Sequence, residues 1–281
     1  MAHIKIITDS TADIPKDLAQ QLNITVVPLT VHFGDQSYKD WYDLTPAEFF
    51  DKLKNSDIIP TTSQVTPAAF EEVFRSEIEQ NDSIICITLS SKASGTYQSA
   101  VIAKNSIENA DIEIIDSMSL SYGYGMIVIE AAKMAKEGKP KQEIIEQVKY
   151  LLDKLDVYFI VDTLEYLKKG GRINLATAVI GNILNIKPVL GIKDGLVVPI
   201  DKIRGSKKVI PKMVKLIKAR GYNLSNQVVG LAHGSIPDKL EELKQAIEQE
   251  FHPKGFTISE VGSVIGAHAG PGIIGVFFMR D

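Results

Sequence analysis

Three short runs of hydroxyl, glycine and histidine residues hold the side chains best suited to chemistry in this sequence of 281 residues. They are residues 61–64 (Thr-Thr-Ser-Gln), 94–99 (Ser-Gly-Thr-Tyr-Gln-Ser) and 266–272 (Gly-Ala-His-Ala-Gly-Pro-Gly). Hydroxyls, backbone amides exposed by glycine and one imidazole can together hold a small anion without a metal. The sequence has no Gly-x-Ser-x-Gly elbow, no P-loop and no Cys-x-x-Cys or His-Glu-x-x-His motif. The runs therefore predict an anion-binding site more readily than a complete set of catalytic groups.

The run at 94–99 follows a predicted strand at 83–89 and opens a predicted helix that extends to about residue 108. Amides at the start of a helix attract anions, and Gly95 lets a ligand approach the backbone closely. In the alternative reading, Ser94 only caps this helix, and residues 61–64 only form a turn before the next helix.

His268 lies in the third run, which contains three glycines and a proline. Such a composition costs conformational entropy, so it indicates a loop whose shape matters. His268 can donate to a bound oxyanion or transfer a proton, although a histidine hydrogen-bonded within a loop fits equally well. His233, after a predicted strand at 227–232, is a second candidate for which we favour a structural role.

Three aspartates, Asp9, Asp116 and Asp162, lie near the ends of predicted strands, where α/β proteins often place functional groups. They can bind magnesium, but nothing in their spacing specifies a metal, and we favour capping or loop hydrogen bonds. We therefore predict no metal site. The single cysteine, Cys86, excludes an intrachain disulfide, and its apolar run at 83–87 is typical of core packing.

The first half of the sequence alternates apolar strands with helices, which favours a parallel sheet between two layers of helices. Thr45-Pro46 and Thr66-Pro67 each place a capping threonine before a first-turn proline. Residues 34–43 show no clear period, and we predict a small insert within about residues 25–60. The predicted strands are 4–7, 25–33, 83–89 and 111–116, and the predicted helices include 15–22, 121–137 and 140–155.

The second half mixes hairpins with helices, which is typical of an α+β domain. Lys193-Asp194-Gly195 separates two extended runs, 188–192 and 196–200, and predicts a hairpin. A strand is predicted at 157–161 and a helix of small residues at 175–184. We place the domain boundary near residue 157.

A basic segment at 202–220 contains eight lysines and arginines and no acidic residue. Its apolar residues, Ile210, Met213, Val214 and Ile217, recur at helical spacing, so one face should pack and the other should be cationic. The cationic face is either a solvated surface or a docking face for an acidic or phosphate-bearing partner, which Lys168, Lys169 and Arg172 can extend.

The overall composition disfavours two classes of partner. The formal net charge of −4 argues against nucleic acid. No apolar stretch approaches the roughly 20 residues that span a bilayer, and the N-terminus has no signal-peptide pattern. With a single cysteine, these features predict a cytoplasmic protein that is not an integral membrane protein.

Taken in order, the motifs resemble the DegV family of bacteria, whose lipid-binding members include the fatty-acid-binding subunits of fatty acid kinase. The resemblance covers essentially the whole chain. It is carried by Thr8-Asp9-Ser10, Thr62-Ser63-Gln64, the segment 94–100, the segment 162–173 and the segment 266–272.

The resemblance implies an α/β protein of two domains. These are an N-terminal parallel-sheet α/β sandwich, residues 1–157, and a C-terminal α+β domain, residues 158–281. One long-chain fatty acid would lie in a buried tunnel between them. Ala93 stands where the family commonly has a bulkier leucine, which would widen the tunnel near the head group.

The resemblance also implies roles for individual residues. The fatty acid carboxylate would meet Thr62 and Ser94, with His268 and the amides of Gly95 and Thr96 nearby. A separate ATP-dependent kinase would phosphorylate the carboxylate, so the chain itself would have no catalytic residue and no cofactor besides its fatty acid ligand. The positions linked to docking the kinase are Arg172, Arg204 and Lys208.

Two other functions remain open from the residues alone. The protein can be an enzyme that acts on a small phosphorylated or acyl substrate with His268 as acid and base. It can also be an interaction protein that signals lipid status through its basic helix.

Overall fold

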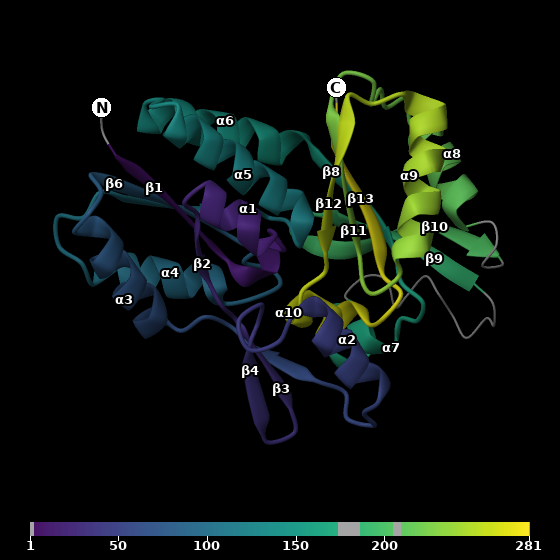
Figure 1. Ribbon diagram of the computed structural model, residues 1–281, viewed down its shortest axis with the longest axis horizontal. Coiled ribbons are helices and arrows are strands. Elements are labelled where there is room, and N and C mark those ends of the chain that lie inside the picture. The colour runs from purple at the N-terminus through teal and green to yellow at the C-terminus, as the bar shows by residue number, and fades with distance from the viewer. Residues whose placement is uncertain (1–2, 174–185, 205–208, 281) are drawn as a thin grey trace.

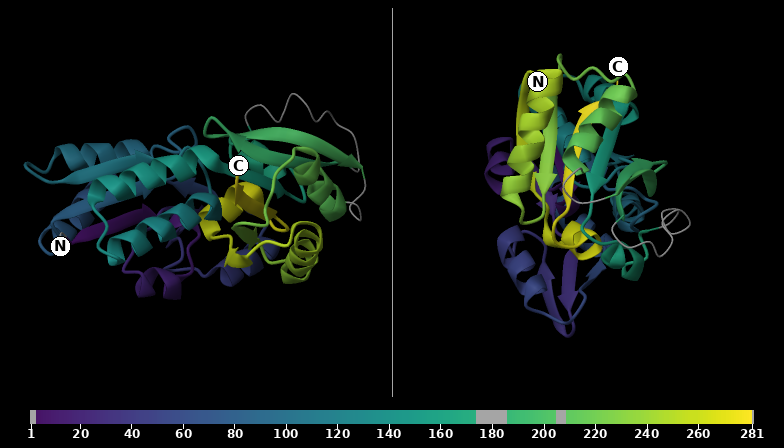
Figure 2. Two further views of the ribbon diagram at one scale, coloured as in Figure 1. Left: turned by 90° about the horizontal axis from the view of Figure 1, so that it is seen from above. Right: turned by 90° about the vertical axis from the view of Figure 1, so that its right-hand side faces the viewer.

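The structure, a computed structural model, describes residues 3–173, 186–204 and 209–280, and the helix predicted at 175–184 lies outside them. The described residues form a mixed α/β protein with three separate sheets of four, six and three strands. Figure 2 shows the four-stranded sheet with its helices at one end of an elongated molecule and the six-stranded sheet at the other.

The four-stranded sheet is parallel throughout and has the order β2-β1-β6-β7. Side chains alternate along each strand, so Ile6 and Ile85 enter one apolar cluster while Ile7 and Ile84 enter another. Helices on both faces complete these clusters, as a buried parallel sheet requires (Figure 1). The strands are β1 (Ile4–Asp9), β2 (Thr25–Val27), β6 (Ser83–Thr88) and β7 (Ile112–Asp116).

The helices of this part begin where the sequence predicts. Thr45 caps α2 (Pro46–Lys54) in a capping box with Glu48, and Thr66 caps α3 (Pro67–Ile78). The other elements are η1 (Ser10–Ala12), α1 (Lys16–Gln21), α4 (Thr96–Asn105), α5 (Tyr122–Lys136) and α6 (Lys141–Lys154).

A three-stranded antiparallel sheet occupies the region of the predicted insert, and Figure 1 shows β3 and β4 projecting from the molecule. Its strands are β3 (Thr30–Phe33), β4 (Gln36–Lys39) and β5 (Thr61–Ser63). The prediction of one strand at 25–33 was wrong, because β2 and β3 join different sheets. Pro28 lies between them and has no N–H to donate to a ladder, which explains the break.

The six-stranded sheet has the order β10-β9-β8-β13-β11-β12, and only β11 and β12 pair in parallel. The predicted hairpin at 193–195 is confirmed, since Lys193 pairs with Leu196 and both intervening residues have positive φ. The strands are β8 (Leu155–Ile160), β9 (Ile186–Lys193), β10 (Leu196–Arg204), β11 (Val228–His233), β12 (Gly255–Glu260) and β13 (Ile274–Met279). The helices are α7 (Glu165–Lys169), α8 (Val209–Ala219), α9 (Pro237–Phe251) and α10 (Ser263–Ala269).

The two faces of this sheet meet different partners. Tyr158 and Ile160 of β8 pack in a cluster with the buried residues of α8 and α9. Val157 and Phe159, on the opposite face, join the cluster that also contains Ile6 and Ile85 of the parallel sheet. One apolar core is therefore shared by the two ends of the molecule. The proposed domain boundary near residue 157 falls within β8.

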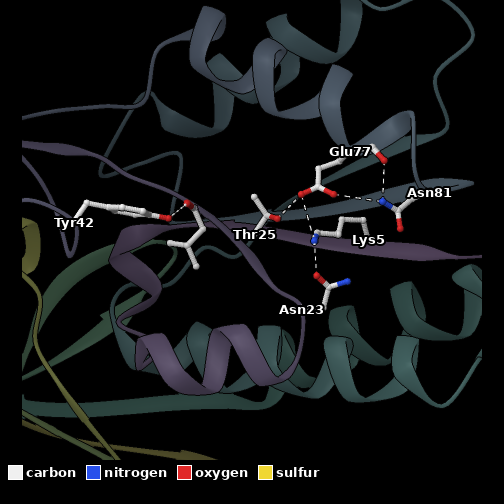
Figure 3. Close-up of polar contacts among 7 residues, drawn as sticks. Lys5, Asn23, Thr25, Tyr42, Glu77 and Asn81 are labelled. Atoms are coloured by element: carbon white, nitrogen blue, oxygen red, sulfur yellow. Dashed lines mark hydrogen bonds and ion pairs between the residues drawn. The ribbon is translucent and has the colours of Figure 1, made fainter.

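Polar side chains connect β1, β2 and α3 through hydrogen bonds and an ion pair (Figure 3). The amino group of Lys5, which is 7 % exposed, donates to Asn23 Oδ1 at 2.8 Å and lies 3.3 Å from Glu77 Oε1. Thr25 Oγ1 also donates to Glu77, at 2.5 Å. The buried lysine is thus paired, which offsets the cost of removing its charge from water.

Two buried carboxylates hold the start of α10. Asp13 accepts from the amide of Gly262 at 2.9 Å, and Asp40 accepts from the amide of Ser263 at 2.7 Å. A Cβ atom on Gly262 would lie 2.9 and 3.0 Å from one oxygen of each carboxylate, so only glycine fits there. Burial raises the pKa of Asp40 to about 6, and burial with the nearby charge of Asp40 raises the pKa of Asp13 well above its usual value.

Replacing Asp40 by asparagine should flatten the dependence of stability on pH. Because the pKa of Asp40 is raised from 3.8 to about 6 on folding, the folded state binds more protons between these values. The free energy of unfolding of the wild type should therefore fall as pH rises through this window, by about 3 kcal/mol from this group. Asp40→Asn keeps an acceptor for Ser263 and loses this contribution.

Urea denaturation across the window, compared with an Asp35→Asn control in the exposed β3–β4 turn, measures the difference. Identical pH slopes for wild type and Asp40→Asn would contradict the raised pKa.

Candidate functional site

A cavity of about 350 Å³ lies between the parallel sheet, the small sheet and the six-stranded sheet. This volume is within the range of small-molecule sites, about 300–1,000 Å³. Its walls are mostly apolar, with side chains from the small sheet, the six-stranded sheet and α10, and from the segments that follow the parallel strands β2, β6 and β7. The apolar lining includes Leu29, Leu89, Leu120, Val157, Phe159, Ile192, Val197, Val261, Val264, Ile265, Ile273 and Phe277. The polar lining is Thr62, Ser63, Gln64, Ser94, Ser121, Arg172 and His268.

Most of the polar lining gathers at one end through direct contacts. Thr62 Oγ1 lies 2.9 Å from His268 Nε2, which joins β5 to α10. A Cβ atom on Gly170 would lie 2.2 Å from His268 Nδ1, so the α7 segment reaches the same imidazole. Arg172 donates through Nη1 to the carbonyl of Gly170 at 2.7 Å and through Nε to the carbonyl of Ala93 at 3.1 Å. These contacts bring the loop of Ser94 to the same place.

His268 is neutral at physiological pH. Burial, with the positive charge of Arg172, lowers the pKa of His268 to about 4. Its Nδ1 is buried and has no hydrogen-bond partner among the residues that the structure describes. Because an unpaired buried N–H is costly, we assign the proton to Nε2, which then donates to Thr62 Oγ1. The Thr62 hydroxyl keeps its own hydrogen, so it can donate to a ligand.

Ser94 lies just before α4 and its role differs from capping. The N-cap residue is Gly95, with no side-chain cap, so Ser94 is not the N-cap residue, although its hydroxyl contacts the first turn of the helix. Ser94 Oγ accepts from the amide of Thr96 at 3.3 Å and lies 3.0 Å from Thr96 Oγ1. If Thr96 donates in the second contact, Ser94 can donate to a ligand. A Cβ atom on Gly95 would lie 2.1 Å from Gln64 Oε1, so the absence of a side chain lets Gln64 pack there.

The structure brings Thr62, Ser94, Gly95 and His268 to one cavity. Thr96 is fully buried behind Ser94, and its hydroxyl is in contact with that of Ser94. Arg172 also lines the cavity, half-buried, although it was predicted only as a docking residue. Of Arg204 the structure describes only the backbone, in β10, and Lys208 lies outside the described residues.

The run at 266–272 was wrongly predicted to be a loop. Residues up to Ala269 belong to α10, and the turn follows at Gly270 and Gly272, which have positive φ. His268 therefore stands on the last turn of a helix whose start the buried aspartates hold. The small residues serve close packing, because a Cβ atom on Gly266 would lie 2.5 Å from the ring of Phe49.

The other candidate residues serve the fold. His233 Nδ1 accepts from the amide of Ile236 at 3.1 Å, and Cys86 is fully buried. Asp9 accepts from Thr11, Leu89 and Tyr124, and burial raises its pKa. Asp116 accepts from the amides of Ser91 and Met118, and Asp162 pairs with Lys187.

Within the described ranges no group of His, Cys, Asp and Glu is arranged to hold a metal ion, and no helix is long and apolar enough to cross a bilayer.

Sequence reasoning missed two features of the site. Arg172 reaches the cavity because Gly170 and Gly171 turn the chain after α7. The sequence Gly-Gly-Arg could have indicated this turn. The hairpin of β9 and β10 was predicted, but its contribution of Ile192 and Val197 to the cavity wall was not. Its tip is held by Ser90, whose hydroxyl donates to the carbonyl of Gly195 at 2.8 Å.

Comparison with known proteins agrees with this architecture. The family model described as "Uncharacterised protein, DegV family" matches residues 3–281. The chain belongs to the DegV family. A DegV domain-containing protein of Caldanaerobacter subterraneus subsp. tengcongensis is 42% identical over 278 residues, 99% of each chain.

Two solved structures of DegV proteins share the fold over their whole length. A fatty-acid-binding DegV family protein from Thermus thermophilus superposes with a TM-score of 0.93 at 34% identity, covering 100% of both chains. DegV of Bacillus subtilis, a fatty acid binding protein, superposes with a TM-score of 0.89 at 30% identity, again covering 100% of both chains.

Removing the Ser90 hydroxyl should loosen the β9–β10 hairpin. Ser90→Ala leaves the buried carbonyl of Gly195 without this donor, which costs about 1–2 kcal/mol. Local opening should become roughly 5- to 30-fold more frequent. Hydrogen exchange of the hairpin amides, with exposed Ser91→Ala as control, measures the change. Unchanged exchange in Ser90→Ala would show that the hairpin is held by its apolar contacts alone.

Proposed function

We propose that this protein binds one long-chain fatty acid in the cavity, with the carboxylate at the polar end and the acyl chain against the apolar walls. The observation that carries the proposal is a cavity whose polar groups gather mostly around Thr62, Ser94 and His268 while its other walls are mostly apolar. The fatty acid binding of the relatives from Thermus thermophilus and Bacillus subtilis supports it.

The head group would be held by several donors. The hydroxyl of Thr62 has a hydrogen to donate, and that of Ser94 has one when Thr96 Oγ1 donates to it. The amide of Gly95 lies at the start of α4, and the amide of Thr96 reaches the head group only if it leaves Ser94 Oγ. The half-buried guanidinium of Arg172 would offset the negative charge, because it lines the same cavity. His268 would act by orienting the Thr62 hydroxyl.

Most of the affinity would come from the acyl chain. Burying each methylene contributes about 0.8 kcal/mol, so a long chain exceeds the contribution of any single head-group hydrogen bond. The polar residues would then fix the position of the carboxylate. This division suits a carrier that must present a reactive group at a fixed place.

The geometry gives little support to the alternative of an enzyme with His268 as acid and base. A group with a pKa of about 4 is a weak base at neutral pH. No carboxylate orients the imidazole, because its Nδ1 has no partner among the described residues. The role of a lipid-status interaction protein would use the same binding site and differs only in the downstream partner.

Lipid extraction tests the proposal directly. Protein purified without added lipid, denatured and analysed by mass spectrometry, should release close to one fatty acid per chain. Recovery of a phosphorylated metabolite in place of fatty acid, or turnover of such a compound by the protein alone, would refute the carrier function and support the enzyme.

Head-group variants locate the carboxylate. Thr62→Val and Ser94→Ala should each weaken fatty acid binding by about 1–2 kcal/mol, or roughly 5- to 30-fold, because each removes one hydrogen bond. Thr61→Val is the matched control, since Thr61 is exposed and is not among the lining residues. Equal affinities in a fluorescent fatty acid displacement assay would place the carboxylate elsewhere.

We further propose that the bound carboxylate is presented to a separate ATP-dependent kinase, which forms an acyl phosphate. Support comes from the basic segment, in which Ile210, Met213, Val214 and Ile217 of α8 are buried, as their spacing predicts. Exposed Lys215 and Lys218 then lie on the outward side of this helix, and Lys218 also pairs with Glu250 of α9. A cationic surface of this kind suits an acidic or phosphate-bearing partner. The proposed docking residues remain Arg172, Arg204 and Lys208, and the single cysteine is consistent with a cytoplasmic location.

Removing two of these charges should separate binding from phosphorylation. Arg204→Ala combined with Lys208→Ala should keep fatty acid affinity and lower the rate at which the purified kinase phosphorylates bound fatty acid, most strongly at low salt. A control that removes two lysines from α9, Lys239→Ala with Lys244→Ala, should leave the rate unchanged. Equal rates for both double variants would show that the basic segment does not dock the kinase.

A further inference from the structure

The cavity has a polar end and an opposite, far end. The direction of the strands β8 and β13 shows where the far end lies. His268 lies in α10, directly before β13, and Arg172 follows α7, shortly after β8. Figure 1 shows α7 and α10 together at this end of β8 and β13. Lining residues further along these antiparallel strands, such as Phe277 and its partner Val157, are therefore remote from the polar cluster.

Phe277 fills this far end with its ring. The side chain is only 3 % exposed and lines the cavity. The ring packs edge-on against Tyr122 of α5, with centroids 6.2 Å apart and planes at 84°. Tyr122 is itself fully buried, so close packing fixes the position of the side chain against which the ring rests.

Two glycines, Gly123 and Gly275, leave the room that the ring occupies. A Cβ atom on Gly123 of α5 would lie 2.8 Å from Phe277 Cδ1. A Cβ atom on Gly275 would lie 3.3 Å from Cζ, so the ring tip leans along β13 towards the polar end. Gly230 of β11 pairs directly with Phe277, but the space at its Cβ position is occupied by Met126, whose Sδ would lie 2.2 Å away.

We infer that Phe277 is the end wall of the acyl site and sets the longest chain that the protein accepts. The inference rests on the proposed function, which it extends to the specificity of the same site.

Enlarging the far end should favour longer chains. Phe277→Ala removes the ring and leaves space bordered by Gly123 and Gly275, which collapses only in part. The preferred length should increase by about two carbons, and affinity for the longest acids relative to palmitic acid should rise roughly tenfold, as expected for about two more buried methylenes. Phe277→Leu is a milder variant with the same direction of change.

Narrowing the site should have the opposite effect. Gly275→Ala adds a methyl group between the ring tip of Phe277 and Phe159, at 3.3 and 3.5 Å, where a small shift is enough to fit it. Gly275 has no positive φ, so alanine fits its backbone. The longest accepted chain should become shorter in this variant.

The experiment measures the affinity of each variant for saturated fatty acids from lauric to behenic acid. Phe278→Ala is the matched control, because Phe278 is the next residue but packs on the other face of the sheet against Tyr158 and Tyr222. Opposite shifts in Phe277→Leu or Phe277→Ala and in Gly275→Ala, with none in Phe278→Ala, support the end wall.

Two negative results are distinguishable. If the wild type binds these acids but all variants share its length profile, the end wall is refuted and the proposed function stands. If the wild type binds none of them, both fall. Thermal unfolding of each variant identifies any that does not fold, in which case the remaining substitutions at 277 and 275 decide.

Discussion

The hydrogen bond between Thr62 and His268 is the contact on which the site depends. It joins residues 206 positions apart in sequence and links the small sheet to the six-stranded end of the molecule. Burial and the charge of Arg172 keep the imidazole neutral, so it donates one hydrogen bond and carries no charge. A charged imidazole here would attract an anion more strongly, but it would also carry a heavy desolvation cost beside a guanidinium.

The position of His268 is fixed from both ends of its helix. Asp13 and Asp40 accept from the amides at the start of α10, and Thr62 contacts the side chain on its last turn. The three acceptors come from the C-cap of η1, the β4–α2 connection and β5, all in the N-terminal half. The head-group end is therefore built where elements of the two halves interlock, and the raised pKa values of the aspartates reflect the cost of that arrangement.

Much of the local structure was predictable, because it depends on residues close in sequence. The capping threonines, the Asp-Gly hairpin and the alternation of strands and helices all follow local rules. The strand at 25–33 failed because Pro28 sends its two halves to different sheets. Asp40 could not be identified, since its burial against Ser263 depends on contacts across 223 residues. The cavity itself could not be predicted from the sequence, because its apolar lining residues are of the same types as residues of a packed core.

The apolar core common to both ends of the molecule limits how the chain can be divided. Ile85 of the parallel sheet and Phe277 of the six-stranded sheet belong to one cluster, and α5 packs between the sheets. Cutting the chain between α6 and β8 would expose a large apolar surface of each fragment to solvent. Neither fragment would keep a complete apolar core of its own. Exchange of one half of the chain between relatives would therefore disrupt the packing of this core.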